Sequence, residues 1–393
     1  MRTTIVALQS KQPLTVAPAV AFPPDEFDVV VLTDGPAAAV LREDVTGPAP
    51  PVTPLGRERW LEHLLALDGP VEVVTNDEYC LAECARLREE LGLAGRHPGR
   101  PVAYLDKVVM KRLLAAGGVR VPRFHAFEPV VTADAAGLLI AEIGLPAVAK
   151  PRQEANSRGI TVLRTPQDLR DWLTAHDGET GWQVDEFVDG TLHHVNGLVR
   201  DGRTTPVQVG RYLGPLLGLD AGRVLGGVTE AESPFTRAAH ELNNRVVRAL
   251  GDKGSFVVHT EFAVNRDGEP VVLEVAGRAP GALVSELARL HAGVNLEVAN
   301  LRLQAGLPIT EPVPQDVQAA WLWPPVMPGT RYREPGPDLS GLRSRHEVHV
   351  RRAAVEGNDG VVGVLGASVL LWHRDPAQLA EDVDRARALT WFV

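Results

Sequence analysis

A hairpin signal between residues 256 and 277 constrains this chain more than any other feature of its sequence. Two short apolar runs, FVVHTEFAV and EPVVLEVAG, are joined by NRDG, which is typical of a tight β-hairpin turn. Each run carries one glutamate among residues that otherwise favour burial, Glu261 in the first and Glu274 in the second, while Glu269 begins the second run at the turn. Like charges on adjacent strands repel, and buried unpaired carboxylates are costly. The hairpin therefore predicts positive charge close to both glutamates.

The composition excludes several classes of protein. A chain of 393 residues predicts two or three domains. Its net charge of −10 argues against a nucleic-acid surface, which needs a basic stripe. The sequence has no apolar run long enough to cross a membrane and no signal-peptide pattern, and its two cysteines, Cys80 and Cys84, suit neither a common zinc site nor a disulfide framework. We expect free, buried thiols and a cytoplasmic protein.

The order of apolar runs predicts an α/β protein with three parts. Residues 1–100 alternate the buried-strand runs TTIVAL, FDVVVLT and VEVVT with helical segments such as DEYCLAECARLREELGL, which indicates an open α/β domain. That domain lacks the G-x-G-x-x-G turn of dinucleotide-binding proteins.

Residues 101–306 predict a second, α+β domain. It begins with a helix at YLDKVVMKRLLAAGG, continues through strands, and ends with one long helix at GALVSELARLHAGVNLEVANLRLQAG. Residues 307–393 predict a smaller α+β domain of short strands that closes with the helix PAQLAEDVDRARALT. Core packing is the favoured interpretation of Trp321 and Trp323 near this junction, and a pocket wall is the alternative.

Basic residues elsewhere in the chain offer the charge that the hairpin lacks. Lys150 ends the apolar strand PAVAKP and precedes the polar loop PRQEANSRGI, an arrangement that suits a phosphate cradle. An exposed surface lysine is the commoner case when this signal is taken alone, and Lys107 is a weaker signal still. Arg278 follows Glu274 by four residues, between two glycines. A structural ion pair is the alternative for this arginine.

Combined, these residues indicate one kind of chemistry. Two carboxylates, two lysines and an arginine are the groups that Mg²⁺–ATP phosphoryl transfer requires, because its catalysis consists mainly of positioning and charge neutralisation. The acidic strand end DEFVDG, residues 185–190, offers acceptors that an adenine and a ribose need, although a solvated turn is favoured when the segment is considered alone.

With these residues in view, the chain resembles the ATP-grasp superfamily, and within it the biotin-carboxylase-like branch that holds carboxylate–amine ligases, including L-amino acid ligases. Five segments carry the resemblance in the right order: NDEYCLAECARLREELGLAG, DKVVMKRLLAAGGVRVPRF, LPAVAKP, VDEFVDGTLHHVNGLVRDG and HTEFAVNRDGEPVVLEVAGRAPG. It implies an N-terminal α/β domain, a central ATP-grasp domain and a C-terminal domain that closes the substrate site.

The resemblance implies a function for individual positions. Glu261 and Glu274 would hold Mg²⁺, commonly as two ions, with Mn²⁺ as a substitute. Arg278 would stabilise the transferring phosphoryl group or the substrate carboxylate, and Lys150 and Arg211 would assist catalysis. The nucleotide would contact these residues: Lys107, Lys150, Ser157, Asp185, Glu186, Phe187, Val188 and His194.

Three positions depart from the family pattern. Ala276 replaces an asparagine that often provides a metal ligand, and the loop QEANSRG is poor in glycine and includes Glu154. Leu192 occupies a hinge position that is often acidic. Strand alternation directs only one of the neighbouring His193 and His194 inward, and we expect His194 to be the inward one.

The implied reaction makes an amide in two steps. A carboxylate takes the γ-phosphoryl group of ATP, and an amine then displaces phosphate from the acylphosphate. The expected substrates are small amino or carboxylic acids, and residues 210–227, with Arg211 and Arg223, would order over them or form a mobile surface loop. Three alternatives stay open: a ligase that loads a carrier protein, a bicarbonate-activating carboxylase, and a module that binds ATP without catalysis. A homodimer is suggested by the resemblance alone.

Overall fold

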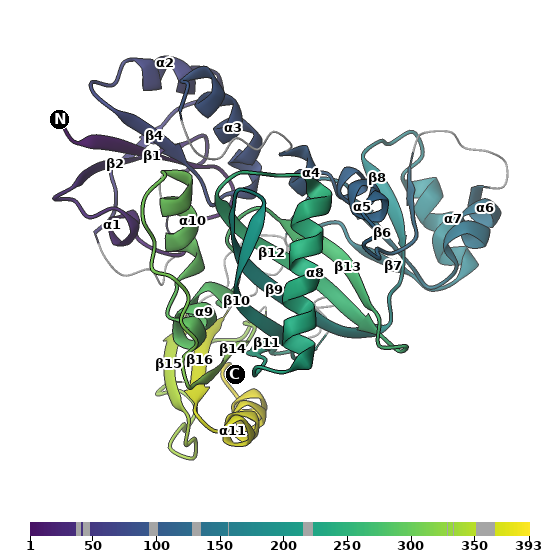
Figure 1. Cartoon of the computed structure of the whole chain (residues 1–393). Coiled ribbons are helices and arrows are strands. Elements are labelled where there is room, and N and C mark those ends of the chain that lie inside the picture. Colours follow the sequence, from purple (N-terminus) through teal and green to yellow (C-terminus); the bar gives the residue numbers. More distant parts are fainter. Residues whose placement is uncertain are drawn as a thin grey trace.

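The computed structural model describes residues 1–36, 41, 48–93, 101–127, 135–155, 157–214, 223–327, 329–332, 334–350 and 366–393. In this part of the chain the strands form three sheets. Figure 1 shows the N-terminal domain, a small lobe on the opposite side, and a large central sheet between them that continues toward the C-terminus. No helix among the described residues is long and apolar enough to cross a membrane.

The N-terminal domain has the predicted open α/β architecture. Its strands pair in parallel in the order β3-β2-β1-β4. Cys80 and Cys84 are buried free thiols, as predicted, in the core beneath α3. The elements are β1 (Thr3–Gln9), α1 (Pro18–Ala21), β2 (Phe27–Thr33), β3 (Val52–Pro54), the 3₁₀ helix η2 (Arg57–Arg59), α2 (Trp60–Leu65), β4 (Val71–Val74), the 3₁₀ helix η3 (Glu78–Cys80) and α3 (Leu81–Glu90).

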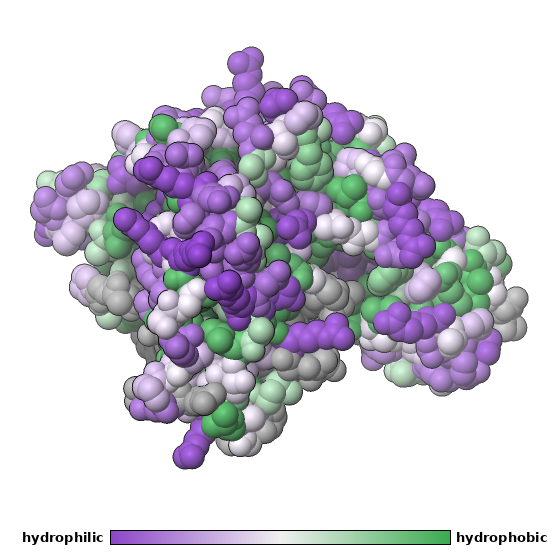
Figure 2. All heavy atoms as spheres, turned by 90° about the horizontal axis from the view of Figure 1, so that it is seen from below, coloured by the Kyte–Doolittle hydropathy of each residue, from purple (hydrophilic) through white to green (hydrophobic). Residues whose placement is uncertain are grey.

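A second sheet forms the small lobe that projects from the body of the molecule (Figures 1 and 2). Its strands are antiparallel in the order β5-β8-β6-β7, and the apolar sides of two helices pack on the sheet through Leu139, Leu169 and Trp172. The elements are β5 (Phe124–Ala126), α6 (Ala135–Ile143), β6 (Ala147–Pro151), β7 (Thr161–Leu163), α7 (Pro166–Ala175) and β8 (Trp182–Glu186).

The third sheet has eight antiparallel strands in the order β13-β12-β9-β10-β11-β14-β16-β15. Helix α8 crosses one face of the sheet (Figure 1), where Leu242 and Val246 are fully or almost fully buried. The elements are β9 (Gly190–Arg200), β10 (Arg203–Tyr212), β11 (Leu225–Thr229), α8 (Pro234–Leu250), β12 (Phe256–Asn265), β13 (Pro270–Ala276), α9 (Val284–Ala292), α10 (Leu296–Gln304), β14 (Gln318–Trp323), β15 (Arg345–Val350), β16 (Ala367–His373) and α11 (Pro376–Ala388).

Two predicted helices are each divided in two. The helix expected at residues 104–118 is instead α4 (Val102–Leu105) followed by α5 (Lys107–Ala116), because the Asp106 carboxylate caps α5 by accepting the N–H groups of Val108 and Val109 at 2.9 and 3.2 Å. The helix expected at residues 281–306 divides into α9 and α10. Gly293 ends α9 in the left-handed region, with φ 71°, and Asn295 caps α10.

Packing contacts cross the predicted domain boundaries at both ends of the central part. Helix α10 packs into the N-terminal core through Val298 and Leu301. Strands β14–β16 and α11 form the expected α+β unit with a core of its own. However, β14 pairs with β11, so this unit extends the central sheet rather than forming a separate one. The boundary near residue 100 lies outside the described residues and stays a prediction.

Candidate active site

The predicted hairpin places two carboxylates side by side. Strands β12 and β13 are antiparallel, and Glu261 lies directly opposite Glu274, next to a register shift between Glu261 and Phe262. The Glu261 Oε1 atom accepts a hydrogen bond from the Tyr212 hydroxyl at 2.5 Å and lies 3.4 Å from His259 Nε2. Burial opposes ionisation, but His259 and Tyr212 outweigh it and lower the pKa of Glu261 to about 2. Glu261 is therefore a carboxylate at neutral pH.

Lys107 supplies the positive charge beside the second carboxylate. Its Nζ atom lies 3.1 Å from Glu274 Oε1 and donates to the carbonyl oxygen of Glu154 at 2.6 Å. Burial lowers the pKa of Lys107, but the carboxylates of Glu274 and Glu78 more than compensate and raise it. Lys107 thus contacts both the hairpin and the loop that follows β6. It provides positive charge close to Glu274, as the sequence predicted.

Two further lysines share one buried aspartate. Lys150 of β6 places Nζ 3.0 Å from Asp185 Oδ2, and Lys111 of α5 pairs with Oδ1 of the same carboxylate. Burial raises the pKa of Asp185, but the two lysines outweigh this and lower it. Lys111 was not among the predicted site residues. Its spacing of four residues from Lys107, on one face of α5, is the sequence signal that could have identified it.

Arg278 is held by a residue of the N-terminal domain. Its Nε atom lies 3.1 Å from Glu78 Oε2, and its guanidinium also donates to the carbonyl oxygen of Ala279 at 2.7 Å. The side chains of Arg278 and Glu78 are 11% and 7% exposed. Burial lowers the pKa of Arg278, but Glu78 and Glu274 outweigh it and raise the pKa. Sequence reasoning missed Glu78, because its partner is 200 residues away along the chain.

The candidate adenine segment follows β8. Glu186 accepts the N–H group of Arg123 at 3.0 Å and forms ion pairs with Arg120 and Arg123 at 3.2 and 3.3 Å. The N–H group of Phe187 donates to the carbonyl oxygen of Pro146 at 3.3 Å. The Glu186 side chain is therefore directed toward arginines of the same lobe, and Asp185 toward lysines. Adenine or ribose contacts by these two side chains stay predictions.

Three other predicted residues have different surroundings. Ser157 has a φ of 58°, in the left-handed region that is unusual for a side-chain-bearing residue. Arg211 pairs with Glu230 at 3.0 Å. His194 faces the Glu261 side of the sheet, as predicted, but it is fully buried, and burial lowers its pKa to about 3. The geometry gives no support to a ribose contact by His194, because its ring is fully buried against Gly210 and does not line the cavity.

These groups surround one cavity of about 980 Å³, at the upper end of the range for small-molecule sites. Each predicted site residue except His194 lines it, together with residues of the N-terminal domain such as Gln12 and Thr15. Figure 2 shows a recess between the small lobe and the body of the molecule. Residues 215–222 of the predicted substrate-covering segment, and Asn156 of the phosphate loop, lie outside the described residues.

The donor set of the hairpin suits a hard divalent cation. Mg²⁺ is typically bound through one or two carboxylates together with phosphate oxygens and waters. Glu261 and Glu274 provide two carboxylates on the cavity wall, and Ala276 provides no further ligand. Among the described residues, no group of three or more His, Cys, Asp or Glu side chains could hold a metal ion by itself. The residues therefore fit a metal that a bound nucleotide helps to coordinate.

Known proteins resemble this chain in both sequence and structure. It is 28% identical over 243 residues to the uncharacterised protein y4rH of Sinorhizobium fredii, a match that covers 60% of this chain and 48% of that protein. It is 26% identical over 203 residues to the D-alanine–D-alanine ligase of Gloeobacter violaceus, a match that covers 49% of this chain and 66% of the ligase. The chain thus spans less than two thirds of the length of both relatives. No family model matches the chain.

The structural similarities extend over the whole chain. An L-amino acid ligase from Bacillus licheniformis is 20% identical and superposes with a TM-score of 0.72, covering 100% of this chain and 99% of that one. An N5-carboxyaminoimidazole ribonucleotide synthetase from Thermotoga maritima is 17% identical, with a TM-score of 0.71 and the same two coverages. The chain has the ATP-grasp fold, and the predicted resemblance to the carboxylate–amine ligases of that superfamily is confirmed.

The free energy of unfolding should depend on pH between about 7 and 10.5, because Lys111 loses its proton at a lower pH in the folded protein than in the unfolded chain. Burial lowers the pKa of Lys111 from 10.5 to about 7; Asp185 opposes that shift, and Lys150 adds to it. Between these two values the unfolded chain binds more protons at this site than the folded chain does. The contribution of Lys111 to the free energy of unfolding therefore rises from pH 7 to about pH 10, on the order of 1.4 kcal/mol per pH unit.

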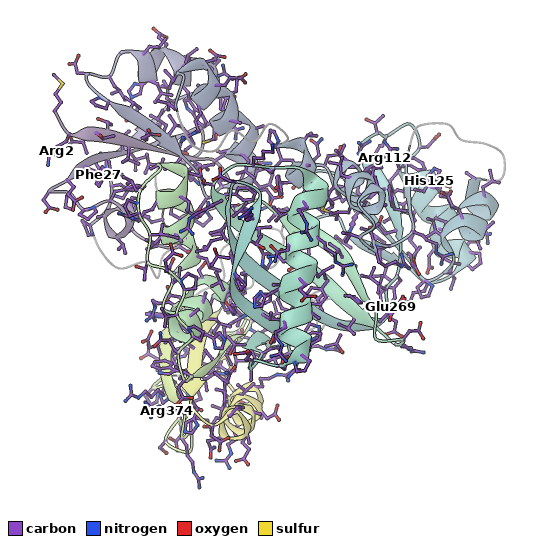
Figure 3. The ribbon with its side chains drawn as sticks, viewed as in Figure 1. Arg2, Phe27, Arg112, His125, Glu269 and Arg374 are labelled. Atoms are coloured by element: carbon purple, nitrogen blue, oxygen red, sulfur yellow. The ribbon has the colours of Figure 1, made fainter. Side chains whose placement is uncertain are left out.

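Urea unfolding of wild-type protein and Lys111→Met, from pH 7 to 10, checks this prediction. The stability of the wild type should increase relative to that of the variant as the pH rises. Arg112→Met is the matched control, because it removes a charge from an exposed residue at the next position of α5 (Figure 3). Parallel curves for wild type and Lys111→Met would show that Lys111 has an ordinary pKa.

Proposed function

We propose that this chain is an ATP-dependent ligase that joins the carboxylate of one small amino or carboxylic acid to the amine of another. The carboxylate attacks the γ-phosphorus of ATP, and the bond from γ-phosphorus to the bridging oxygen breaks with release of ADP. The amine then attacks the acylphosphate carbon, loses a proton and expels phosphate. One observation carries the proposal: Lys107, Lys150, Arg278, Glu261 and Glu274, from three parts of the fold, line one cavity.

Each group has a defined part in this proposal. Glu261 and Glu274 would hold Mg²⁺, which supplies charge neutralisation at the β- and γ-phosphates; Mn²⁺ is expected to substitute, and two ions are expected. Lys107 and Lys150 would bind phosphate oxygens, and the loop that contains Ser157 would contact the same phosphates. Arg278 would stabilise charge on the transferring group. Structural neighbours solved with ADP and with MgADP support a nucleotide in this fold.

The nucleotide base would lie at the end of the cavity nearest β8. Phe187 and Val188 would offer backbone groups to the adenine, and Asp185 or Glu186 would contact the sugar or base edge. Arg211, which lies on β10, would form an ion pair with a substrate carboxylate. The sequence similarity to D-alanine–D-alanine ligases supports the ligase over the other ATP-dependent reactions of this fold.

A bicarbonate-activating carboxylase is the second candidate, because N5-carboxyaminoimidazole ribonucleotide synthetase and L-amino acid ligase superpose almost equally well, with TM-scores of 0.71 and 0.72. Phosphate release from Mg²⁺–ATP, measured with amino acids singly and in pairs and with bicarbonate, tests both. Release that requires a particular pair, with a new amide mass, supports the ligase. Release with bicarbonate and no amine supports the carboxylase.

Two further outcomes of the same assay concern the remaining alternatives. Release that needs an added carrier protein would support carrier loading. Tight ATP binding with no release under any condition would support a non-catalytic module. We propose a homodimer, which light scattering of the purified protein checks; one structural neighbour is a biotin carboxylase domain dimer.

A further inference from the structure

One end of the cavity is walled by two tryptophans that the reaction does not use. Trp321 and Trp323 lie on β14, and both line the cavity. Their ring centroids are 5.2 Å apart, with the rings in an edge-to-face arrangement at 65°. They belong to an apolar cluster with Leu225, Leu283 and Leu287. Core packing, the favoured interpretation from sequence, is confirmed for both rings, which are 1% and 8% exposed, and both also border the cavity.

Strand pairing connects the apolar end of the cavity to the end that holds the hairpin of β12 and β13. Tyr212 of β10 pairs with Gly227 of β11, and Gly227 pairs with Trp321 of β14. Tyr212 also belongs to the tryptophan cluster, and its hydroxyl donates to Glu261. A single tyrosine thus has its ring in the apolar cluster and its hydroxyl on a candidate metal ligand. The apolar end is continuous with the site where the acyl group would react.

Gly227 gives the tryptophan wall its shape. A Cβ atom at Gly227 would lie 2.6 Å from Trp321 Nε1, so the indole can lie across β11 only because this position has no side chain. Trp323 pairs with Leu225, two residues along the same strand. A side chain at Gly227 would therefore force this indole to move.

The two indoles also present unsatisfied donors. Trp321 and Trp323 are 1% and 8% exposed, and neither Nε1–H has a hydrogen-bond partner among the described residues. Buried donors without acceptors are unfavourable, and tryptophan N–H groups usually find a partner. Both Nε1 atoms are themselves buried, so the parts of these side chains that line the cavity are apolar carbon atoms, and the pocket suits an apolar occupant.

We propose that this pocket binds the side chain of one of the two substrates, and that this substrate is an amino or carboxylic acid with a large apolar side chain. Trp321 and Trp323 are specificity-determining residues. The inference rests on the proposed ligase function and names its substrate class.

Side-chain preference of the ligase reaction provides the test. We expect kcat/KM to be at least about tenfold higher for substrates such as phenylalanine and O-methyltyrosine than for alanine, the scale that a few methylene groups give in an apolar pocket. Trp323→Leu should remove most of that preference through an increase in KM for the large substrates. Trp372→Leu is the matched control, because Trp372 packs in the same cluster but does not line the cavity. An unchanged preference in Trp323→Leu would overturn the proposal.

A second variant keeps an aromatic ring at this position. Trp323→Phe should retain the preference for phenylalanine over alanine, measured as a ratio of kcat/KM values, because it keeps an apolar ring on the wall of the cavity. Thermal unfolding of each variant identifies any that fail to fold. A folded Trp323→Phe variant that loses this preference as completely as Trp323→Leu would show that an apolar ring here does not set the preference, and would overturn the proposal.

Failure of the ligase function is distinguishable from failure of this inference. If no pair of acids yields an amide, calorimetric titration of phenylalanine, O-methyltyrosine and alanine into protein with Mg²⁺ and a non-hydrolysable ATP analogue replaces the kinetic assay. Tighter binding of the large acids that Trp323→Leu abolishes would support the pocket although the reaction is wrong. Equal binding of all three acids, or no binding, would overturn the pocket.

Discussion

Glu274→Gln should reduce Mg²⁺-dependent ATP turnover at least about 100-fold, the usual loss when a group that stabilises transition-state charge is removed. The substitution keeps the shape of the side chain and deletes its charge. Glu274 lies opposite Glu261 and 3.1 Å from Lys107, so the change removes a candidate metal ligand and the partner of a phosphate-binding lysine together. Phosphate release at saturating ATP over a range of Mg²⁺ concentrations measures the effect.

Glu269→Gln is the matched control for this result. Glu269 is an exposed residue at the turn of the same hairpin, as Figure 3 shows, and its substitution deletes the same charge outside the cavity. Its turnover should match that of the wild type. Near-wild-type turnover by Glu274→Gln, with the Mg²⁺ dependence unchanged, would show that the hairpin is not the metal site.

Arg278→Met should lower both stability and activity, because it leaves a charged partner behind. Glu78 is 7% exposed, and its ion pair in the described structure is with Arg278. Removing one partner of a buried pair typically costs about 3–5 kcal/mol, since the remaining charge is uncompensated. We expect a loss of that size in the free energy of unfolding, measured with urea, and a loss of turnover on the order of 100-fold.

A double substitution separates the two effects. Glu78→Gln with Arg278→Met removes both charges, so it should recover most of the lost stability but none of the turnover. Arg374→Met is the surface control, because the Arg374–Asp316 pair is 3.9 Å apart and largely exposed (Figure 3). A double variant as unstable as Arg278→Met would mean that arginine packing, and not the charge pair, holds the two domains here.

Local patterns predicted many of the helices and strands well. The hairpin between β12 and β13, the strands of the N-terminal sheet and the buried free cysteines follow from apolar runs, turn residues and spacing, which act over a few residues. The helix divisions at Asp106 and Gly293 were missed, although an N-cap aspartate and a C-cap glycine are themselves local signals.

The partners of the site residues were beyond the reach of these patterns. Lys111 and Lys150 converge on Asp185, and Arg278 meets Glu78 across the domains, because antiparallel strands and packed helices bring distant segments together. His194 is a further example. Strand alternation correctly predicted the face of the sheet on which it lies, but not that neighbouring strands bury it completely and keep it out of the cavity.

The sequence by itself determined the charges that this protein needs: two glutamates on a hairpin, and lysines and an arginine to neutralise them. Only the tertiary structure decided which cation meets which carboxylate, and that Trp321 and Trp323 border the same cavity as Glu261. The physical reason is the distance along the chain over which each kind of interaction acts. Turn, cap and strand preferences act between near neighbours in the chain, whereas ion pairing and burial depend on distances that only the packed sheets define.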